Sequence, residues 1–333
     1  VGAYREAGVD LDAAAEAVSL IRKVASTATR PEVVEGVGGF AGLFRLDDRR
    51  LLAAAADGVG TKIEVAREVG RLDTVGIDLV AMSANDVACT GAEPLFFLDH
   101  VVTERLVPAE VAALVEGVAE GCRRAGCALL GGETAEHPGH LPEGGFDLAG
   151  FCVGIVDREA MLGPHRVRPE DALVGLRSSG LHANGFSLVR RAVVGMDLGR
   201  TPEGLDRPLG EELLEPTLVY APFVALAARR ELIRSAAHIT GGGLVENVPR
   251  ALPAGAGARL ERPAWIPPEV FGFVARAADV AEEDMFRTFN MGLGMVLVVD
   301  RGAVGEVVDL AAEAGFQATE VGRVTGDPGV TLA

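Results

Sequence analysis

Asp57-Gly58-Val59-Gly60-Thr61-Lys62 is the most informative stretch of this sequence, because Lys62 is one of only two lysines in 333 residues. With 31 Lys+Arg in total, 31 minus these 2 leaves 29 arginines. The glycines let the backbone approach a ligand closely, Asp57 can hold a divalent cation, and Lys62 can neutralise a phosphoryl oxygen. The stretch therefore predicts a corner that binds phosphate and metal. The alternative is a plain turn between a strand and a helix, with an ordinary surface lysine.

Length and composition favour two domains of the α/β class. A chain of 333 residues is about twice the length of a typical domain, and 49% of it is hydrophobic. Only 5% is aromatic, which predicts cores of small aliphatic side chains on helices and sheets. The periodicity is lost and Gly, Pro and Arg gather around 162–169, so we place the boundary between domains 1–165 and 166–333.

Charge and residue usage argue against several classes of protein. A formal net charge of −17 opposes general nucleic-acid binding. No apolar run is long enough to cross a membrane and no signal pattern opens the sequence, so we expect a cytoplasmic protein. The four cysteines lack the spacing of a metal site and are predicted to be reduced structural thiols: Cys89, Cys122, Cys127 and Cys152.

Hydrophobic periodicity predicts the order of helices and strands. In the first half we expect helices at 11–28, 74–91 and 108–125, and strands at 51–56, 94–102, 127–130 and 146–156. In the second half we expect strands at 172–176, 236–239, 295–299 and 318–324, with helices from 186, at 222–230 and at 303–314. The strand at 295–299, the helix at 303–314 and the strand at 318–324 predict a β-α-β unit. The glycine-dense segment 36–42 predicts a mobile flap with Phe40 as a possible anchor.

Acidic residues at the ends of these elements are the candidate metal and catalytic groups. Asp78 and Asp86 lie eight residues apart on one predicted helix and can share a face. A carboxylate in an apolar helix is costly to bury unless it is paired or binds a cation, so Asp86 and Asn85 predict a Mg²⁺ site together with Asp57. Asp78 is a weaker candidate, and the alternative is a capping or buried-network acid. Glu133 follows a strand predicted to be buried, at the end where ligands sit in open α/β sheets.

Three further polar turns complete the candidate site. In Ser178-Ser179-Gly180-Leu181-His182-Ala183-Asn184-Gly185, serines and backbone amides can surround a phosphate and His182 can move a proton. A lone loop histidine is also often structural. The turns His238-Ile239-Thr240-Gly241-Gly242-Gly243 and Arg287-Thr288-Phe289-Asn290-Met291-Gly292 offer further anion sites, each weak alone.

Taken together, these motifs resemble the phosphoribosylformylglycinamidine cyclo-ligase family, also called aminoimidazole ribonucleotide synthetase. The matching stretches occur in family order at 4–10, 36–42, 57–62, 76–86, 92–99, 131–139, 178–190, 238–249 and 285–295. The resemblance implies a two-domain α/β (α+β) fold, with an N-terminal domain that forms a dimeric β-barrel with its partner and a C-terminal α/β domain with a glycine-rich loop. It also implies a homodimer that converts ATP and formylglycinamidine ribonucleotide to aminoimidazole ribonucleotide, ADP and phosphate.

The same resemblance assigns roles to individual residues. Asp57 and Asp86, with Asn85, would hold Mg²⁺ and ATP, and Lys62 would contact the phosphates. The remaining nucleotide contacts would come from Gly38, Gly39, Phe40, Gly42, Gly58 and Thr61. The substrate side is assigned, as our hypothesis, to Ser178, Ser179, Gly180, His182, Asn184, Thr240, Gly241 and Gly242. His182 and Glu133 join the two aspartates as candidate catalytic groups.

Three departures from the family pattern concern the substrate pocket only: Ala183, Phe186 and His137 replace the serine, tyrosine and methionine that are usual. Two other functions stay open. A sister phosphotransferase, such as thiamine monophosphate kinase or a selenide-activating enzyme, would keep the aspartates but need a different second half. A non-enzymatic scaffold would have lost some of the carboxylates or Lys62, and none is lost.

Overall fold

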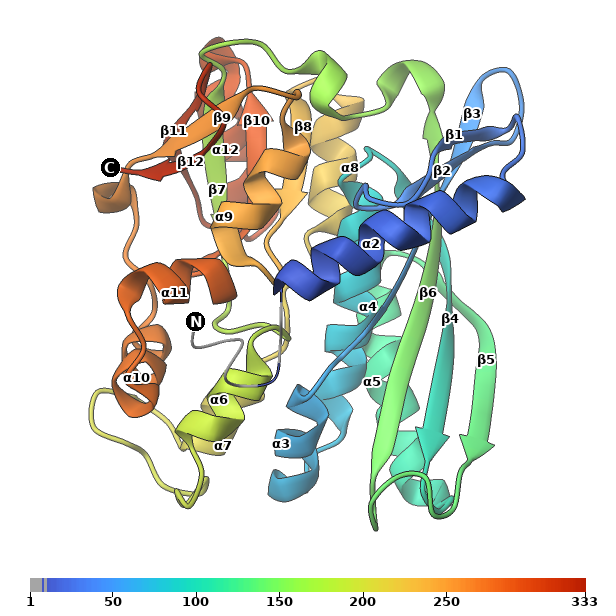
Figure 1. The fold of residues 1–333 in the computed structure, drawn as a ribbon, viewed down its shortest axis with the longest axis vertical. Helices are drawn as coiled ribbons and strands as arrows, with labels where there is room; N and C mark the ends of the chain where they lie inside the picture. Colours follow the sequence, from blue (N-terminus) through green and yellow to red (C-terminus); the bar gives the residue numbers. More distant parts are fainter. Residues whose placement is uncertain (1–7, 9–10) are drawn as a thin grey trace.

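The computed structural model describes residue 8 and residues 11–333, so most of the matching stretch 4–10 lies outside the described residues. The first half is built on a six-stranded sheet with the order β1-β2-β3-β6-β4-β5 (Figure 1). Its strands are β1 (Val33–Glu35), β2 (Gly42–Arg45), β3 (Arg50–Gly58), β4 (Glu93–Thr103), β5 (Ala128–Glu136) and β6 (Phe146–Asp157). Within this sheet only β4 and β5 pair in parallel. Its helices are α2 (Leu11–Ala25), α3 (Lys62–Val69), α4 (Asp73–Ala88) and α5 (Pro108–Ala125).

The second half is built on another six-stranded sheet, with the order β12-β9-β11-β7-β10-β8. Its strands are β7 (Ala172–Arg177), β8 (Ile233–His238), β9 (Gly257–Leu260), β10 (Leu293–Val299), β11 (Ala318–Thr325) and β12 (Gly329–Leu332). Its helices are α6 (Phe186–Ala192), α7 (Leu209–Leu213), α8 (Ala221–Arg229), α9 (Gly243–Asn247), α10 (Glu269–Ala278), α11 (Glu282–Thr288) and α12 (Val304–Glu313). The expected β-α-β unit is present but split, because β7 lies between β10 and β11 and is antiparallel to both.

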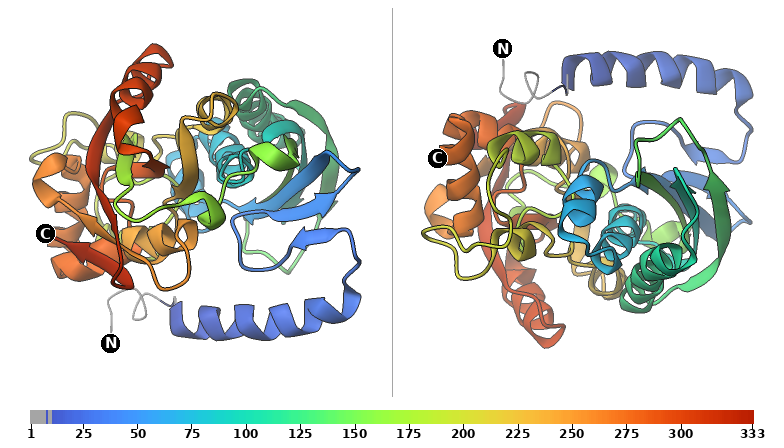
Figure 2. Two further views of the ribbon diagram at one scale, coloured as in Figure 1. Left: turned by 90° about the horizontal axis from the view of Figure 1, so that it is seen from above. Right: turned by 90° about the horizontal axis from the view of Figure 1, so that it is seen from below.

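Helix α4 is the central element of the molecule and is buried on nearly every side. All of its residues except Asp73 and Asp86 are buried. It packs against α5 and the first sheet, and it also contacts α8 of the second half (Figures 1 and 2). A side chain at Gly76 would overlap the backbone of Gly117 and Val118, so these glycines are what lets the two helices cross so closely. This packing places the C-terminal turn of α4, with Asp86, at the junction of the two halves.

Most expected elements are confirmed, and the helix at 108–125 has the predicted bounds. The prediction of a buried strand at 127–130 is wrong in two respects. Strand β5 runs on through the Gly131-Gly132-Glu133 segment, and most of its residues are exposed, with Leu130 at 65%. It is an edge strand with one side unpaired. Apolar residues in a short run cannot distinguish a strand covered on both faces from one left open.

The predicted boundary between 165 and 166 falls in the connection between the last strand of the first sheet and the first strand of the second; it stays a prediction. Among the described residues, no helix combines the length and the apolar character that a membrane span requires.

Candidate active site

Two carboxylates, Asp57 near the end of β3 and Asp86 in the last turn of α4, form the electrostatic centre of the site. Burial is the main cause that raises the pKa of Asp57 from 3.8 to about 6, and the negative charge of Asp86 raises it further. The Asp57 carboxylate accepts a hydrogen bond from the amide of Gly58 at 2.7 Å, which opposes this rise. Two mutually repelling carboxylates are a fitting donor set for a divalent cation.

His238, the last residue of β8, holds Asp86 in place. Its Nδ1 lies 2.9 Å from Oδ1 of Asp86, and its Nε2 lies 3.4 Å from Nδ2 of Asn85. A carboxylate can only accept and an amide nitrogen can only donate, so this pattern fits a ring with its proton on Nδ1. The side chain of His238 is fully buried. The sequence had suggested His238 only as part of an anion-binding turn, and its contact with Asp86 was not predicted.

A cleft of about 330 Å³ opens beside Asp57, between the two halves of the chain. One wall is the corner 57–61 and the other is the loop 183–187. Thr61 and Ser187 face each other across it, with their hydroxyl oxygens 3.4 Å apart. Oδ1 of Asn184 is buried and lacks a hydrogen-bond partner within the described part of the chain. Asn184 thus lines this cleft with one acceptor unused.

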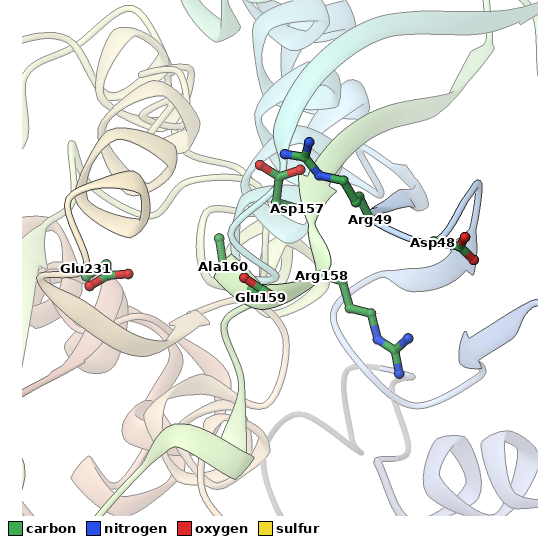
Figure 3. A pocket seen from close by; sticks show the side chains of 7 residues that line it. All are labelled: Asp48, Arg49, Asp157, Arg158, Glu159, Ala160 and Glu231. Carbon is green, nitrogen blue, oxygen red and sulfur yellow. The ribbon is translucent and has the colours of Figure 1, made fainter.

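A larger pocket of about 660 Å³ lies beyond the other end of β3. Figure 3 shows the guanidinium of Arg49 beside the carboxylate of Asp157 there. Arg49 precedes the first residue of β3 and Asp57 comes near its end, so about 25 Å of strand separates this pocket from the aspartate corner. None of the predicted site residues lines it.

The turn 240–243 and the segment 38–42 come together through Asn247 and Arg250. The side-chain amide of Asn247 donates to the carbonyls of Gly241 at 3.0 Å and Gly243 at 2.9 Å, which fixes the turn. Arg250 donates to the carbonyl of Gly39 at 2.9 Å, and its Cζ lies 3.9 Å from the centre of the Phe40 ring. The predicted flap therefore lies against the second half of the chain. Neither Asn247 nor Arg250 was predicted as a site residue, although an aromatic side chain within a glycine-rich segment suggests that it has a partner.

The side chain of Lys62 does not line the cleft beside the corner 57–61, where the sequence predicts it. Its side chain is fully buried beneath the cleft, with Nζ 2.8 Å from Oδ2 of Asp78. The same nitrogen donates to the carbonyls of His182 at 2.9 Å and Glu215 at 2.8 Å. An ammonium has three donors, and all three are used. Lys62 thus ties the first half of the chain to the second and has no donor left for a phosphate.

The metal roles predicted for Asp78 and Asn85 are also not supported by the structure, because both side chains are enclosed. Asp78, the weaker metal candidate, is paired with Lys62 and accepts hydrogen bonds from the amide and hydroxyl of Thr217 at 2.8 and 2.6 Å. Asn85 is fully buried, donates to the carbonyl of Leu218 at 2.9 Å and accepts from the amide of Tyr220 at 2.7 Å. Both side chains hold the segment 217–220 of the second half against α4, and neither lines the cleft.

The loop around His182 is more internal than predicted. His182 is only 1% exposed, and burial holds the pKa of its imidazole well below the usual range. The hydroxyl of Ser179 donates to the carbonyl of Pro216 at 2.6 Å, and that of Ser178 to Oδ1 of Asn290 at 2.9 Å. Gly180 is buried too. The side chains of these residues make contacts within the protein and fix the loop. The arrangement therefore does not support the predicted substrate contacts of His182, Ser178, Ser179 and Gly180.

Glu133 lies far from the aspartate corner within the same chain. The pairing register runs from Asp57 to Gly150, then to Asp99 and to Gly132 at the edge of the sheet. Three strand spacings separate the two ends, which is about 14 Å. Glu133 is exposed, and its carboxylate accepts a hydrogen bond from the amide of Thr134. The rule that led to its prediction applies to parallel sheets, whereas most of this sheet is antiparallel.

We expect Asp57→Asn to stabilise the protein in the absence of metal. Because the pKa of Asp57 is raised to about 6, the folded protein binds this proton more tightly than the unfolded chain does. The resulting penalty is absent below about pH 4, grows as the pH rises through about 6 and is complete above that. The variant should gain about 1–2 kcal/mol in the free energy of unfolding at about pH 8, and nothing at about pH 4.

Urea unfolding in EDTA at both pH values measures this difference. Asp48→Asn serves as the control, since Asp48 is an exposed carboxylate near the far end of β3, and it should leave stability unchanged at both. A loss of stability in Asp57→Asn at the higher pH would contradict the expectation.

Comparison with known proteins matches both halves of the chain to one family. Residues 38–156 match the family model described as "AIR synthase related protein, N-terminal domain", and residues 168–333 match its C-terminal domain. The phosphoribosylformylglycinamidine cyclo-ligase of Myxococcus xanthus is 49% identical over 99% of this chain and 98% of its own length. That of Gloeobacter violaceus is 50% identical over 99% of both chains. Among solved structures, AaThiL complexed with AMPPCP and TMP has a TM-score of 0.66 at 16% identity, covering 94% of this chain and 92% of that one.

The fold and the interdomain corner thus define a protein of the AIR synthase related class, with both of its domains present. Identity near 50% over almost the whole length narrows this class further. The chain belongs to the phosphoribosylformylglycinamidine cyclo-ligase family.

Proposed function

We propose that this protein catalyses the ATP-dependent cyclisation of formylglycinamidine ribonucleotide to 5-aminoimidazole ribonucleotide, with release of ADP and phosphate, in purine biosynthesis. The observation that carries the proposal is the pair Asp57 and Asp86 beside a cleft between the two halves, in a chain of this family. Nucleotide binding is also suggested by the AMPPCP bound to AaThiL, which shares the fold.

The reaction has two steps. An amide oxygen is a poor leaving group, so the γ-phosphoryl group of ATP is first transferred to the formyl oxygen of the substrate and ADP leaves. A substrate nitrogen then attacks the activated carbon, the five-membered ring closes, and the carbon–oxygen bond breaks to release phosphate. Such chemistry depends on charge neutralisation and positioning more than on a protein nucleophile.

The residues of the corner fit this requirement. Asp57 and Asp86 would hold Mg²⁺, which supplies charge neutralisation at the phosphates when it is bound. Among the described residues, no group of three or more His, Cys, Asp or Glu side chains is arranged to hold a metal. Two carboxylates still suit Mg²⁺, since this ion is commonly held by one or two carboxylates together with phosphate and water oxygens.

The chain also supplies contacts on both sides of the cleft. The glycine-containing corner 57–61, with Thr61, and the segment 38–42 would bring backbone amides to the phosphates. Asn184, with its unpartnered oxygen, and the turn 240–243 would position the ribonucleotide substrate. Lys62, His182 and Glu133 take no part in this assignment, since the first two are enclosed and the third lies at the far edge of the sheet.

A homodimer is the proposed assembly, formed by the first sheets of two copies as a shared barrel. Apolar side chains remain uncovered on three neighbouring strands of that sheet, with Leu95 and Phe151 each 40% exposed and Leu130 65% exposed. Large apolar side chains exposed on neighbouring strands are typical of a protein interface, and pairing there would cover the open edge of β5.

The test of the function is product identity. The purified protein is incubated with ATP, Mg²⁺ and formylglycinamidine ribonucleotide, and the products are analysed by mass spectrometry. We expect aminoimidazole ribonucleotide, ADP and phosphate in equal amounts. A stable phosphorylated product without ring closure would favour a sister phosphotransferase instead, and an absence of ADP would reject the ATP-dependent reaction.

A further inference from the structure

Arg250 connects the segment 38–42 of the first half to the second half of the chain. Its guanidinium donates to the carbonyl of Gly39 at 2.9 Å and lies over the Phe40 ring, with Cζ 3.9 Å from the ring centre. Residues 33–38 before Gly39 and Phe40 are exposed, whereas Ala41 after them is buried and Gly42 pairs with Ala54 of β3. Arg250 thus holds Gly39 and Phe40 to the second half by a hydrogen bond and a cation–π contact.

The other end of the same guanidinium reaches the glycine turn. Arg250 donates to Oδ1 of Asn247 at 2.9 Å, and Nδ2 of Asn247 donates to the carbonyls of Gly241 and Gly243. Asn247 is only 1% exposed, so the position of its amide depends on the shape of the turn that it contacts. A continuous chain of contacts therefore runs from the turn 240–243 through Asn247 and Arg250 to Gly39 and Phe40.

These contacts are weak enough to break and re-form. Arg250 is itself exposed, and at exposed positions a cation–π contact and a single hydrogen bond favour one arrangement by only about fivefold to a hundredfold. Residues 38–40 can therefore move away from the second half to admit a nucleotide. A ligand that fixes either end of the chain of contacts shifts this balance toward the closed arrangement.

We propose that Arg250 is a positioning residue that couples substrate binding at the turn 240–243 to closure of the segment 38–42 over the nucleotide. The inference rests on the proposed function, which places ATP at the aspartate corner and the ribonucleotide at the turn. A substrate that holds the turn in this shape fixes Asn247, which fixes Arg250, which then holds Gly39 and Phe40. Coupling of this kind is reciprocal, so ATP tightens substrate binding by the same factor.

Calorimetry on the full chain tests the coupling. The dissociation constant of β,γ-methylene-ATP with Mg²⁺ is measured with and without formylglycinamidine ribonucleotide. For the unmodified protein we expect the substrate to tighten binding about fivefold or more. Arg250→Lys keeps the charge but loses the planar fork, and Phe40→Leu keeps the apolar volume but loses the ring. In each of these two variants, the substrate should change the dissociation constant of the nucleotide by no more than about twofold. Phe40→Tyr keeps the ring and should retain the full effect of the substrate.

The double variant and a surface control make the result specific. The double variant Phe40→Leu with Arg250→Lys should reduce the coupling no further than either single variant does, because both changes remove the same contact. Arg259→Lys, at an exposed ion pair with Glu261 on β9, should keep the factor of the unmodified protein. A coupling factor near one in the unmodified protein, or an unchanged factor in both single variants, overturns the coupling while product formation upholds the function. A protein that neither binds the nucleotide nor forms product overturns both proposals.

Discussion

Replacement of Lys62 by methionine is expected to lower the free energy of unfolding by about 3–5 kcal/mol. The change leaves the carboxylate of Asp78 fully buried without its countercharge and removes the hydrogen bonds to the carbonyls of His182 and Glu215. Burial lowers the pKa of Lys62 and raises that of Asp78, which disfavours the charged form of each. Each charge is therefore tolerated inside the protein only because the opposite charge lies beside it. Chemical denaturation followed by circular dichroism measures the loss.

Two comparisons separate this explanation from others. The double variant Lys62→Met with Asp78→Asn removes the buried charge and keeps an acceptor for Thr217, so it should recover about half of the loss or more. Arg124→Met breaks the exposed pair with Glu120 and should cost less than about 1 kcal/mol. If Lys62 instead contacted phosphates, the single variant would keep its stability and lose ATP affinity, and that result would refute the structural role.

Asp86→Asn is expected to reduce Mg²⁺-dependent ADP release at least about a thousandfold while the protein stays folded. The carboxylate is 17% exposed and lies at the end of α4, where it faces the charge of Asp57. An amide of the same shape can still accept the hydrogen bond from His238, but it lacks the negative charge that a cation requires. A coupled assay for ADP at saturating ATP and Mg²⁺ measures the effect.

The control is Asp73→Asn on the same helix. Asp73 is exposed in the first turn of α4 and is the other unburied residue of that helix. This variant should release ADP at the rate of the unmodified protein. Turnover of Asp86→Asn within about tenfold of that rate would remove Asp86 from the metal site.

The order of helices and strands could be predicted from the sequence because it depends on local periodicity. The helix at 108–125 opens on a proline and ends before Gly126, whose φ of 69° stops a helix. The strand that delivers Asp57 could be predicted for the same reason. The position of β5 could not, because the same apolar run suits a central strand or an open edge.

The polar residues that the sequence singled out fall into two groups in the structure. Asp57 and Asp86 were recognised because acids beside glycines or in an apolar helix need an explanation, and the structure places them within reach of each other's charge. Lys62 was recognised because lysine is rare in this chain, and Asn85 because it adjoins Asp86, yet both lie inside the protein. A polar residue that bridges two domains and one that binds a ligand give the same local pattern in a sequence.

The sequence alone determined the identity and spacing of the groups: which turns contain glycine, which strand carries Asp57 and which helix carries Asp86. Only the tertiary structure decided which of these polar groups face the cleft and which are enclosed. Lys62 contacts residues 120 and 153 positions further along the chain, and Arg250 contacts a carbonyl 211 positions before it. Contacts across such separations arise when the two sheets pack around α4, and no local pattern of residues encodes which side of that packing a side chain will occupy.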